Sequence, residues 1–235
     1  MRKTLFFFVK VFNNKDYAND FIGGKIYANK LSYFRKLEET AEANRGDSNE
    51  GVLSWLQPDE IVLEINGRVI GDLAGPVSVQ MNWHGQLNVF CIYAAHNGNL
   101  KSLNRENITE FKKQLEIPLD CLKLGQYAVV ITRANEFLER MKLAIKESGY
   151  GYRAGLVEYY DPMSFNGSFS EAEAIFKKGR EYEHQREYRF AIDTGIVSEV
   201  PLILNIGDIS DIAVLCKTDE LNKKLEIRFP EGKNA

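Results

Sequence analysis

Residues 4–12 read TLFFFVKVF, and this stretch gives the clearest indication of the fold. Its apolar residues run almost without a break, which is typical of a strand buried on both faces. Outward from it, residues 14–22 predict a short helix with Asn13 or Asn14 as its cap and the Gly23-Gly24 pair as its stop. Residues 25–29 predict a second short strand. The chain is therefore expected to begin with a strand, a helix and a strand.

Strand and helix patterns continue along the rest of the chain. Within residues 31–44 the second half favours a helix. Further strands are predicted at residues 61–65, 77–81, 87–95, 127–132, 155–160, 187–192, 202–204, 212–216 and 225–229, and helices at residues 108–115, 133–148 and 170–182. Turn signals separate the first three of these strands, which suggests an antiparallel meander.

These patterns predict a single α+β domain over residues 1–235. We expect a strand-rich, largely antiparallel mixed sheet with three to five packed helices. The alternative is a domain boundary near residues 97–105, where a polar run lies between apolar segments. Because no linker-like composition marks that place, one domain is the simpler interpretation.

Composition and charge restrict the class of protein. A net charge of −3 and a pI near 5.8 argue against a surface built as a whole for a polyanion, although a local basic patch is compatible with them. The three cysteines are widely spaced, and neither they nor the three histidines fit a zinc pattern, so we expect no disulfide framework and no metal. Lys10 interrupts the first apolar run, and nothing approaches the roughly 20 apolar residues of a membrane span. The expectation is a cytoplasmic protein with no membrane partner.

The segment from Glu183 to Asp193 is the most informative one for function. Period-2 alternation places Tyr188, Phe190 and Ile192 on one side of a predicted strand. The other side receives Gln185, Glu187, Arg189 and Ala191. Such a face can bind a phosphorylated ligand, with Arg189 on a phosphate and Glu187 on a sugar hydroxyl. The same alternation also describes an ordinary edge strand with one solvated face.

A second candidate is the polar loop over residues 45–51, which reads Arg-Gly-Asp-Ser-Asn-Glu-Gly. Its glycines and polar residues predict an exposed loop, and loops of this kind often carry function. If the loop folds over the face of Gln185 and Arg189, Arg45 could bind phosphate, and Asp47 or Glu50 could hydrogen-bond a ribose or an acceptor. Arg35 is a third basic group near this loop, and its alternative role is to cover aromatic surface with its aliphatic stem.

At these two segments the chain resembles a bacterial and phage family of domain-of-unknown-function proteins. Its members pair an Asn-Asp-Pro-x-Glu loop with a later Glu-x-Glu-aromatic-Arg strand. Here residues 46–51 correspond to the loop and residues 185–189 to the strand, with Gln185 where the family has Glu and no proline after Asp47.

That family is similar to ADP-ribosyltransferases in its late motif, and Gln-x-Glu is a variant within that enzyme class. The resemblance implies NAD as the substrate. It implies that Glu187 hydrogen-bonds the nicotinamide ribose and stabilises an oxocarbenium-like transition state, while Gln185 orients the acceptor. Arg45, Arg35 or Lys10 would hold the phosphates.

Three functional hypotheses remain open at this point. The first is an NAD-consuming ADP-ribosyltransferase or NAD glycohydrolase that acts as a toxin or in phage conflict, with a nucleotide as small molecule and a protein or nucleic acid as acceptor. The second is a non-catalytic module that binds nucleic acid through the basic segment from Lys177 to Arg189, which also carries Tyr182 and Tyr188. The third is a protein-interaction or inhibitor protein without a small-molecule site.

Overall fold

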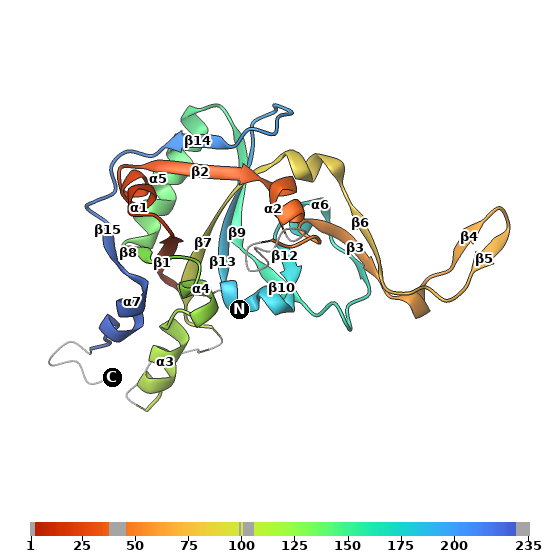
Figure 1. Ribbon diagram of the computed structural model, residues 1–235, viewed down its shortest axis with the longest axis horizontal. Helices are drawn as coiled ribbons and strands as arrows, with labels where there is room; N and C mark the ends of the chain where they lie inside the picture. The colour runs from red at the N-terminus through yellow and green to blue at the C-terminus, as the bar shows by residue number, and fades with distance from the viewer. Residues whose placement is uncertain (1–2, 38–45, 99, 101–105, 229–235) are drawn as a thin grey trace.

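The computed structural model describes residues 3–37, 46–98, 100 and 106–228. Its largest element is an eight-stranded sheet with the order β14-β2-β7-β1-β8-β15, to which β13 and β9 are added at β7 (Figure 1). The strands are β1 (Leu5–Phe12), β2 (Lys25–Lys30), β7 (Asn88–His96), β8 (Tyr127–Ile131), β9 (Gly151–Leu156), β13 (Glu187–Asp193), β14 (Leu202–Asn205) and β15 (Ala213–Lys217). All their pairings are antiparallel.

The first apolar run forms β1, which lies inside the sheet between β7 and β8. Two adjacent residues of β1, Phe8 and Val9, are both buried and belong to hydrophobic clusters on opposite faces of the sheet. The prediction of a strand buried on both faces is therefore confirmed for the middle of this segment.

Helices cover both faces of the sheet. On the first face, α1 (Lys15–Ile22) and α5 (Ala134–Glu147) pack on β1, β7 and β13 through a cluster centred on Phe21, Phe90 and Phe137. On the second face, α3 (Ile108–Leu115), α4 (Leu119–Leu122) and α7 (Thr218–Lys224) form one cluster, and a separate cluster includes residues of α2 (Leu31–Leu37) and the loop after α6 (Glu171–Ala174). The second face is thus divided between two clusters.

Local signals explain the boundaries of α1. The Asn14 side chain accepts a hydrogen bond from the Asp16 amide at 2.8 Å, so the predicted cap is confirmed. At the other end, Gly24 has a φ of +94°, and a Cβ there would lie 2.1 Å from the Gly207 carbonyl oxygen. Only glycine fits this close approach between the α1–β2 turn and the segment after β14.

The predicted antiparallel meander over residues 61–95 is wrong. Its three strand patterns go to three different sheets: β4 (Leu63–Ile65) pairs with β5 (Arg68–Ile70), β6 (Val77–Gln80) pairs with β3 (Val52–Leu56), and β7 joins the main sheet. Strand β3 also pairs with β11 (Gly167–Ser168), whereas β10 (Glu158–Tyr160) and β12 (Lys177–Gly179) form a parallel pair. Alternation identifies strands, but it does not choose their partners.

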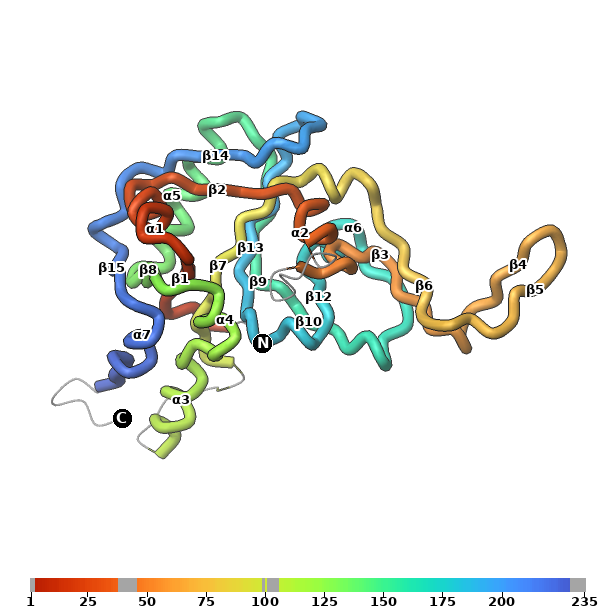
Figure 2. Tube along the Cα trace, in the orientation of Figure 1, coloured from red at the N-terminus to blue at the C-terminus, as the bar shows by residue number. Residues whose placement is uncertain are grey.

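Strands β4 and β5 form a hairpin that extends away from the rest of the molecule (Figure 2). We call residues 62–72 the arm. At its tip, Asn66 and Gly67 have φ values of +52° and +76°, as the turns that join two strands most tightly require. Three of its aliphatic side chains, Val62, Ile65 and Val69, are exposed by 74%, 63% and 66%.

The expected α+β class and the largely antiparallel sheet are confirmed. The described residues contain seven α-helices, whereas three to five were expected. Two of the seven, α4 and α6, have only four residues each, and α7 was not expected. The strand predicted at residues 225–229 is wrong as far as it is described, since residues 225–228 are irregular and follow α7. In the part of the chain that the structure describes, no helix is both long enough and apolar enough to cross a membrane.

Candidate active site

Strand β13 is an interior strand with two different faces. It pairs with β7 on one edge and β9 on the other, so the interpretation as a solvated edge strand is wrong. Phe190 and Ile192 lie in the apolar cluster of the first face, with Tyr188 packed against it, as the alternation predicts. Glu187 and Arg189 point to the second face and are only 7% and 1% exposed.

Four charged side chains meet on this second face, and we call Glu50, Lys178, Glu187 and Arg189 the charge cluster. Arg189 binds Glu50 through two hydrogen bonds, Nη1 to Oε2 at 2.8 Å and Nη2 to Oε1 at 3.0 Å. Its Nη2 also donates to Glu187 Oε1 at 3.0 Å. Lys178 Nζ lies 2.9 Å from Glu50 Oε1 and 3.3 Å from Glu187 Oε2.

The two cations and two carboxylates balance in charge, and all four side chains are at least nine-tenths buried. Burial alone would raise the pKa of Glu187, but Arg189 and Lys178 outweigh it and hold that pKa well below its usual range. Burial would lower the pKa of Lys178, whereas Glu187 and Glu50 raise it above the ordinary value. Glu187 is therefore an ionised carboxylate at neutral pH.

Backbone contacts and neighbouring polar groups fix the strand and its charged partners further. Arg189 Nη1 donates to the Ile175 carbonyl at 2.7 Å. Gln185 Oε1 accepts a hydrogen bond from Lys178 Nζ at 2.8 Å, and the Tyr159 hydroxyl accepts one from the Glu187 amide at 3.0 Å. The predicted pair Gln185 and Glu187 thus shares one cation.

The loop that carries Glu50 is not the exposed loop that its polar sequence predicts. Asp47 and Glu50 are each only 2% exposed. The chain turns back at Gly51, where φ is +69° and a Cβ would lie 2.9 Å from Leu31. Burial of the Glu50 carboxylate is tolerated because two cations, Lys178 and Arg189, contact it. Arg189 is 139 residues away from Glu50 in the sequence. The loop does fold onto the face of Arg189, while Arg45 lies outside the described residues.

The main sheet is split next to this charge cluster. Strand β13 occupies one edge of β7 from Asn88 to Tyr93. On the opposite edge, β2 pairs with Asn88 and Val89, and β1 pairs with the segment from Tyr93 to His96. Residues 90–92 therefore have no partner among the described strands on that edge, because β1 and β2 diverge there.

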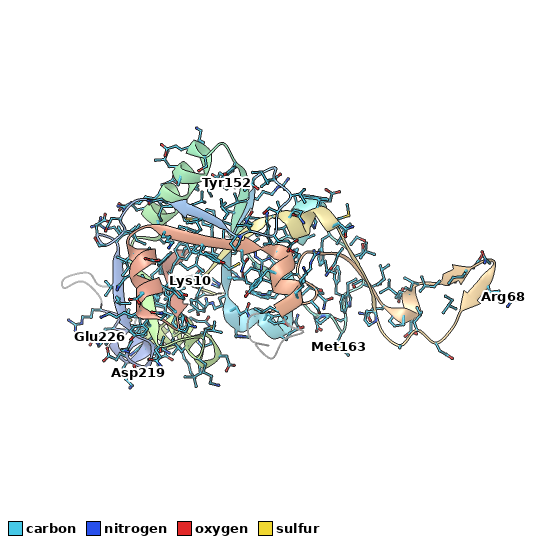
Figure 3. All side chains as sticks on the ribbon, turned by 45° about the horizontal axis from the view of Figure 1, so that its top comes forward. Lys10, Arg68, Tyr152, Met163, Asp219 and Glu226 are labelled. Carbon is cyan, nitrogen blue, oxygen red and sulfur yellow. The ribbon has the colours of Figure 1, made fainter. Side chains whose placement is uncertain are left out.

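Lys10 lies in this split (Figure 3). Its Nζ donates a hydrogen bond of 2.5 Å to the Cys91 carbonyl and stands 5.0 Å from the centre of the Phe90 ring. A side chain thus satisfies a backbone acceptor that a neighbouring strand would otherwise bind. A lysine within an apolar strand is explained in this way, and its cation reaches the cleft described next.

A cleft of about 650 Å³ follows the split, within the size range of small-molecule sites. Its floor comes from β1 and β7, one wall from α1, β2 and α2, and the other from the segment around α4. The charged, amide and tyrosine residues that line it are Lys10, Asn13, Tyr17, Asp20, Lys25, Tyr27, Asn29, Tyr33, Glu50, Tyr93, Lys178, Gln185 and Glu187. Four candidate residues from the sequence, Lys10, Glu50, Gln185 and Glu187, are therefore brought together on one cleft.

Among the described candidates, Arg35, Asp47 and Arg189 do not line this cleft. The guanidinium of Arg189 is engaged by Glu50, Glu187 and the Ile175 carbonyl, so it holds carboxylates in place instead of presenting a free fork to a phosphate. Arg35 Nε donates to the Glu50 carbonyl at 2.7 Å, and burial lowers the pKa of Arg35. Asp47 accepts a hydrogen bond from the Asn49 amide at 2.8 Å. These residues position the Glu50 loop.

Lys178 is the important residue that the predicted helix over residues 170–182 obscured. The capping box of Ser170 and Glu173 is present, but the helix ends at Ala174. Strand β12 follows because it pairs with β10, and this strand carries Lys178 to the charge cluster. The short run of apolar residues after Ala174, Ile175 and Phe176, was the available signal that the helical pattern stops.

The basic segment from residue 177 to residue 189 does not present an open row of cations. Lys177 pairs with Glu158, and Arg180 Nη1 lies 3.1 Å from Asp161. Arg186 Nη2 donates to the His96 carbonyl at 2.7 Å. Nucleic-acid binding through this segment needs free lysine and arginine side chains, and the structure engages each of them in an internal contact.

The cleft contains two thiols, Cys91 and Cys121. Burial and the neighbouring Glu187 raise the pKa of Cys91 to about 12, so its thiol is protonated at neutral pH. Cys121 is buried in the opposite wall, and burial likewise raises its pKa to about 12. Among the described residues, no group of three or more His, Cys, Asp or Glu side chains could hold a metal ion.

No protein-family model matches the chain, and neither a curated protein nor a solved structure matches it. The functional argument therefore depends on the cleft, the charge cluster and the chemistry that these side chains allow.

Proposed function

We propose that this chain is an NAD-consuming enzyme of the ADP-ribosyltransferase type, which cleaves the bond between nicotinamide and ribose. The observation that carries the proposal is Glu187 itself. Its carboxylate faces a cleft of suitable size, is held at Oε1 by Arg189 and at Oε2 by Lys178, and stands beside Gln185. A carboxylate fixed in this way is an ionised hydrogen-bond acceptor in a defined place.

In the proposed reaction, the bond from ribose C1′ to the nicotinamide nitrogen breaks, and nicotinamide leaves with the electron pair as a neutral molecule. The sugar becomes oxocarbenium-like, and an acceptor oxygen or water then forms the new bond to C1′. The attacking water or acceptor hydroxyl loses one proton, which goes to solvent. Because Lys178 and Arg189 offset the charges of Glu50 and Glu187, the main task of Glu187 is to hold a ribose hydroxyl rather than to supply net negative charge.

The neighbours of Glu187 receive supporting roles in this proposal. Gln185 orients the acceptor, and Glu50 completes the charge cluster and hydrogen-bonds substrate or acceptor from the wall of the cleft. Lys10 is the cation in the split that would contact the phosphates. A cytoplasmic toxin or a protein of phage conflict would exert its effect through such an activity, with a protein or a nucleic acid as acceptor.

The test is nicotinamide release from NAD by purified protein, with and without cell extract as a source of acceptors. We expect Glu187→Gln to lower the rate by at least about 100-fold, in the range found when a single group that stabilises a transition state is removed. Glu183→Gln is the matched control, because Glu183 is exposed and does not line the cleft.

Glu187 is also part of a buried ion network, so its variant must be shown to be folded by circular dichroism. If it is not, Gln185→Ala serves as the second variant, since Gln185 lines the cleft outside the four charges. Release that is equally fast in folded Glu187→Gln, or absent from folded wild type under every condition, would contradict the proposal.

A protein-interaction role is the second candidate, and one observation favours it. The arm exposes Val62, Ile65 and Val69, and a two-stranded hairpin of this kind is marginally stable alone in water. If wild type releases no nicotinamide, and replacement of residues 62–72 by a short glycine-serine turn abolishes the biological effect, the interaction role accounts for the protein.

A further inference from the structure

The end of the cleft remote from Glu187 carries two open tyrosine rings. Tyr17 and Tyr27 line the cleft and are 60% and 55% exposed. They come from α1 and β2, which follow each other directly through the Gly23-Gly24 turn. In Figure 1, α1 and the beginning of β2 lie well apart from β12 and the beginning of β13. The cleft thus joins two different ends, one with the charge cluster and one with exposed aromatic rings.

A polar pair accompanies the two rings. Asp20 follows Tyr17 by three positions on α1, so the two side chains share a helix face. Lys25 precedes Tyr27 by two positions on β2, which places them on the same face of the strand. The Lys25 ammonium lies 2.9 Å from the Asp20 carboxylate, and both side chains are 51% exposed.

Core packing does not account for these rings. A single exposed tyrosine is ordinary, but here Tyr17, Tyr27 and Tyr33 come from three elements and open onto one cleft, with Tyr33 itself 44% exposed. Tyr27 also pairs across β2 and β14 with Ile203, which lines the same cleft. A planar ring is the ligand group that such surfaces bind, because each base presents a π-face to an aromatic side chain.

The charges along the cleft restrict the class of ligand that contains this planar ring. The lining residues include three lysines, Lys10, Lys25 and Lys178, and three carboxylates, Asp20, Glu50 and Glu187. Three positive and three negative charges leave no net attraction for a polyanion. A small nucleotide with one or two phosphates fits this balance better than a long nucleic-acid strand does.

We propose that Tyr17 and Tyr27 bind the nucleobase at the far end of the substrate, so that the enzyme selects a dinucleotide over nicotinamide mononucleotide. The carboxylate of Asp20 accepts hydrogen bonds from an amino group or a ribose hydroxyl of that nucleoside, and the Lys25 ammonium donates to a ring nitrogen or a hydroxyl. This assignment of specificity rests on the proposed NAD cleavage, although the nucleobase site itself can be measured without it.

The experiment compares kcat/KM for NAD and for nicotinamide mononucleotide in wild type, Tyr17→Ala, Tyr27→Ala and Tyr27→Phe. Loss of one stacking ring should lower kcat/KM for NAD by roughly 5- to 100-fold through KM, with kcat nearly unchanged. The value for the mononucleotide should not change, and Tyr27→Phe should stay near wild type because it keeps the ring. Tyr152→Ala is the matched control, since Tyr152 is 37% exposed on β9 and does not line the cleft.

Binding of adenosine 5′-monophosphate, followed by calorimetry or by NMR of the protein, separates this inference from the proposed function. If wild type cleaves neither substrate but binds the monophosphate, and Tyr27→Ala weakens that binding at least about fivefold, the nucleobase site holds while the proposed activity fails. If NAD is cleaved and the alanine variants keep its preference over the mononucleotide, the inference is overturned. Absence of monophosphate binding by wild type at millimolar concentration overturns it as well.

Discussion

The charge cluster and the arm both include strands that mix apolar and charged residues, but they place these residues oppositely with respect to solvent. In β13 the charged Glu187 and Arg189 alternate with Tyr188 and Phe190, and tertiary contacts with Glu50 and Lys178 bury these charges almost completely. In the arm, aliphatic residues are interspersed with charged and polar ones. There the structure leaves Val62, Ile65 and Val69 in solvent.

The two regions differ in how far apart in sequence their contacting residues are. The arm forms from contacts that are local in sequence, because β4 and β5 pair through a turn of two residues. The charge cluster joins residues from position 50 to position 189 and depends on three separate backbone segments. Removal of one side chain should therefore lower the free energy of unfolding strongly in the charge cluster and hardly at all in the arm.

The largest effect is expected from Arg189→Met. The substitution leaves Glu50 and Glu187 buried with only Lys178 to compensate them, and breaking a buried ion network in this way costs about 3–5 kcal/mol. Urea denaturation of the variant and the wild type at pH 7 measures the loss of unfolding free energy.

Arg68→Met is the control for the loss of an arginine, because Arg68 is exposed near the tip of the arm. Exposed substitutions of this kind change stability by less than about 0.5 kcal/mol. If Arg189→Met cost no more than Arg68→Met, the charge cluster would not stabilise the fold, and the contrast between the two regions would disappear.

Local sequence signals were sufficient for much of the fold and for part of the site. The continuous apolar run of β1, the cap at Asn14 and the two faces of β13 each follow from neighbours in the sequence. So does the Asn66-Gly67 turn, which the sequence marks as a turn signal. These features need no information about distant parts of the chain.

The remaining features depend on partners that are distant in sequence. The loop of Glu50 looks solvent-exposed because nothing nearby shows that Arg189 and Lys178 will neutralise it. The segment of Lys178 looks helical because its pairing partner, β10, is distant from it in sequence. The split between β1 and β2 has no local signature except a lysine within an apolar strand.

A smaller loss of unfolding free energy is expected at acid pH, and it should arise at His96, outside the arm. His96 is 5% exposed, and burial together with the Arg186 guanidinium lowers its pKa to about 3, with Lys3 adding to the effect. An unfolded histidine titrates near pH 6.5, so between that value and pH 3 the unfolded chain binds more protons than the folded one. The stability linked to His96 is complete above about pH 6.5 and falls as the pH drops.

The slope for one proton is about 1.4 kcal/mol per pH unit, so going from pH 6.5 to 4.5 should cost about 2 kcal/mol through His96. Urea denaturation at both pH values measures this loss in the wild type and in His96→Gln. The variant should lose about 2 kcal/mol less than the wild type. An equal loss in both proteins would show that other groups cause the acid sensitivity.

The smallest effect is expected from Gly67→Ala in the arm. Gly67 has a φ of +76° with no atom near the place of a Cβ, so the substitution is opposed by backbone conformation alone, at a cost of about 1 kcal/mol. Because the arm is completed locally, this cost should act on the hairpin and not on the body. Amide hydrogen exchange in β4 and β5 should become about fivefold faster, while the urea midpoint stays unchanged.

Gly71→Ala is the matched control, since Gly71 also has free space around it but does not have a positive φ. A lower urea midpoint for Gly67→Ala than for Gly71→Ala would mean that the arm is energetically coupled to the body, and the two regions would then differ in exposure but not in independence.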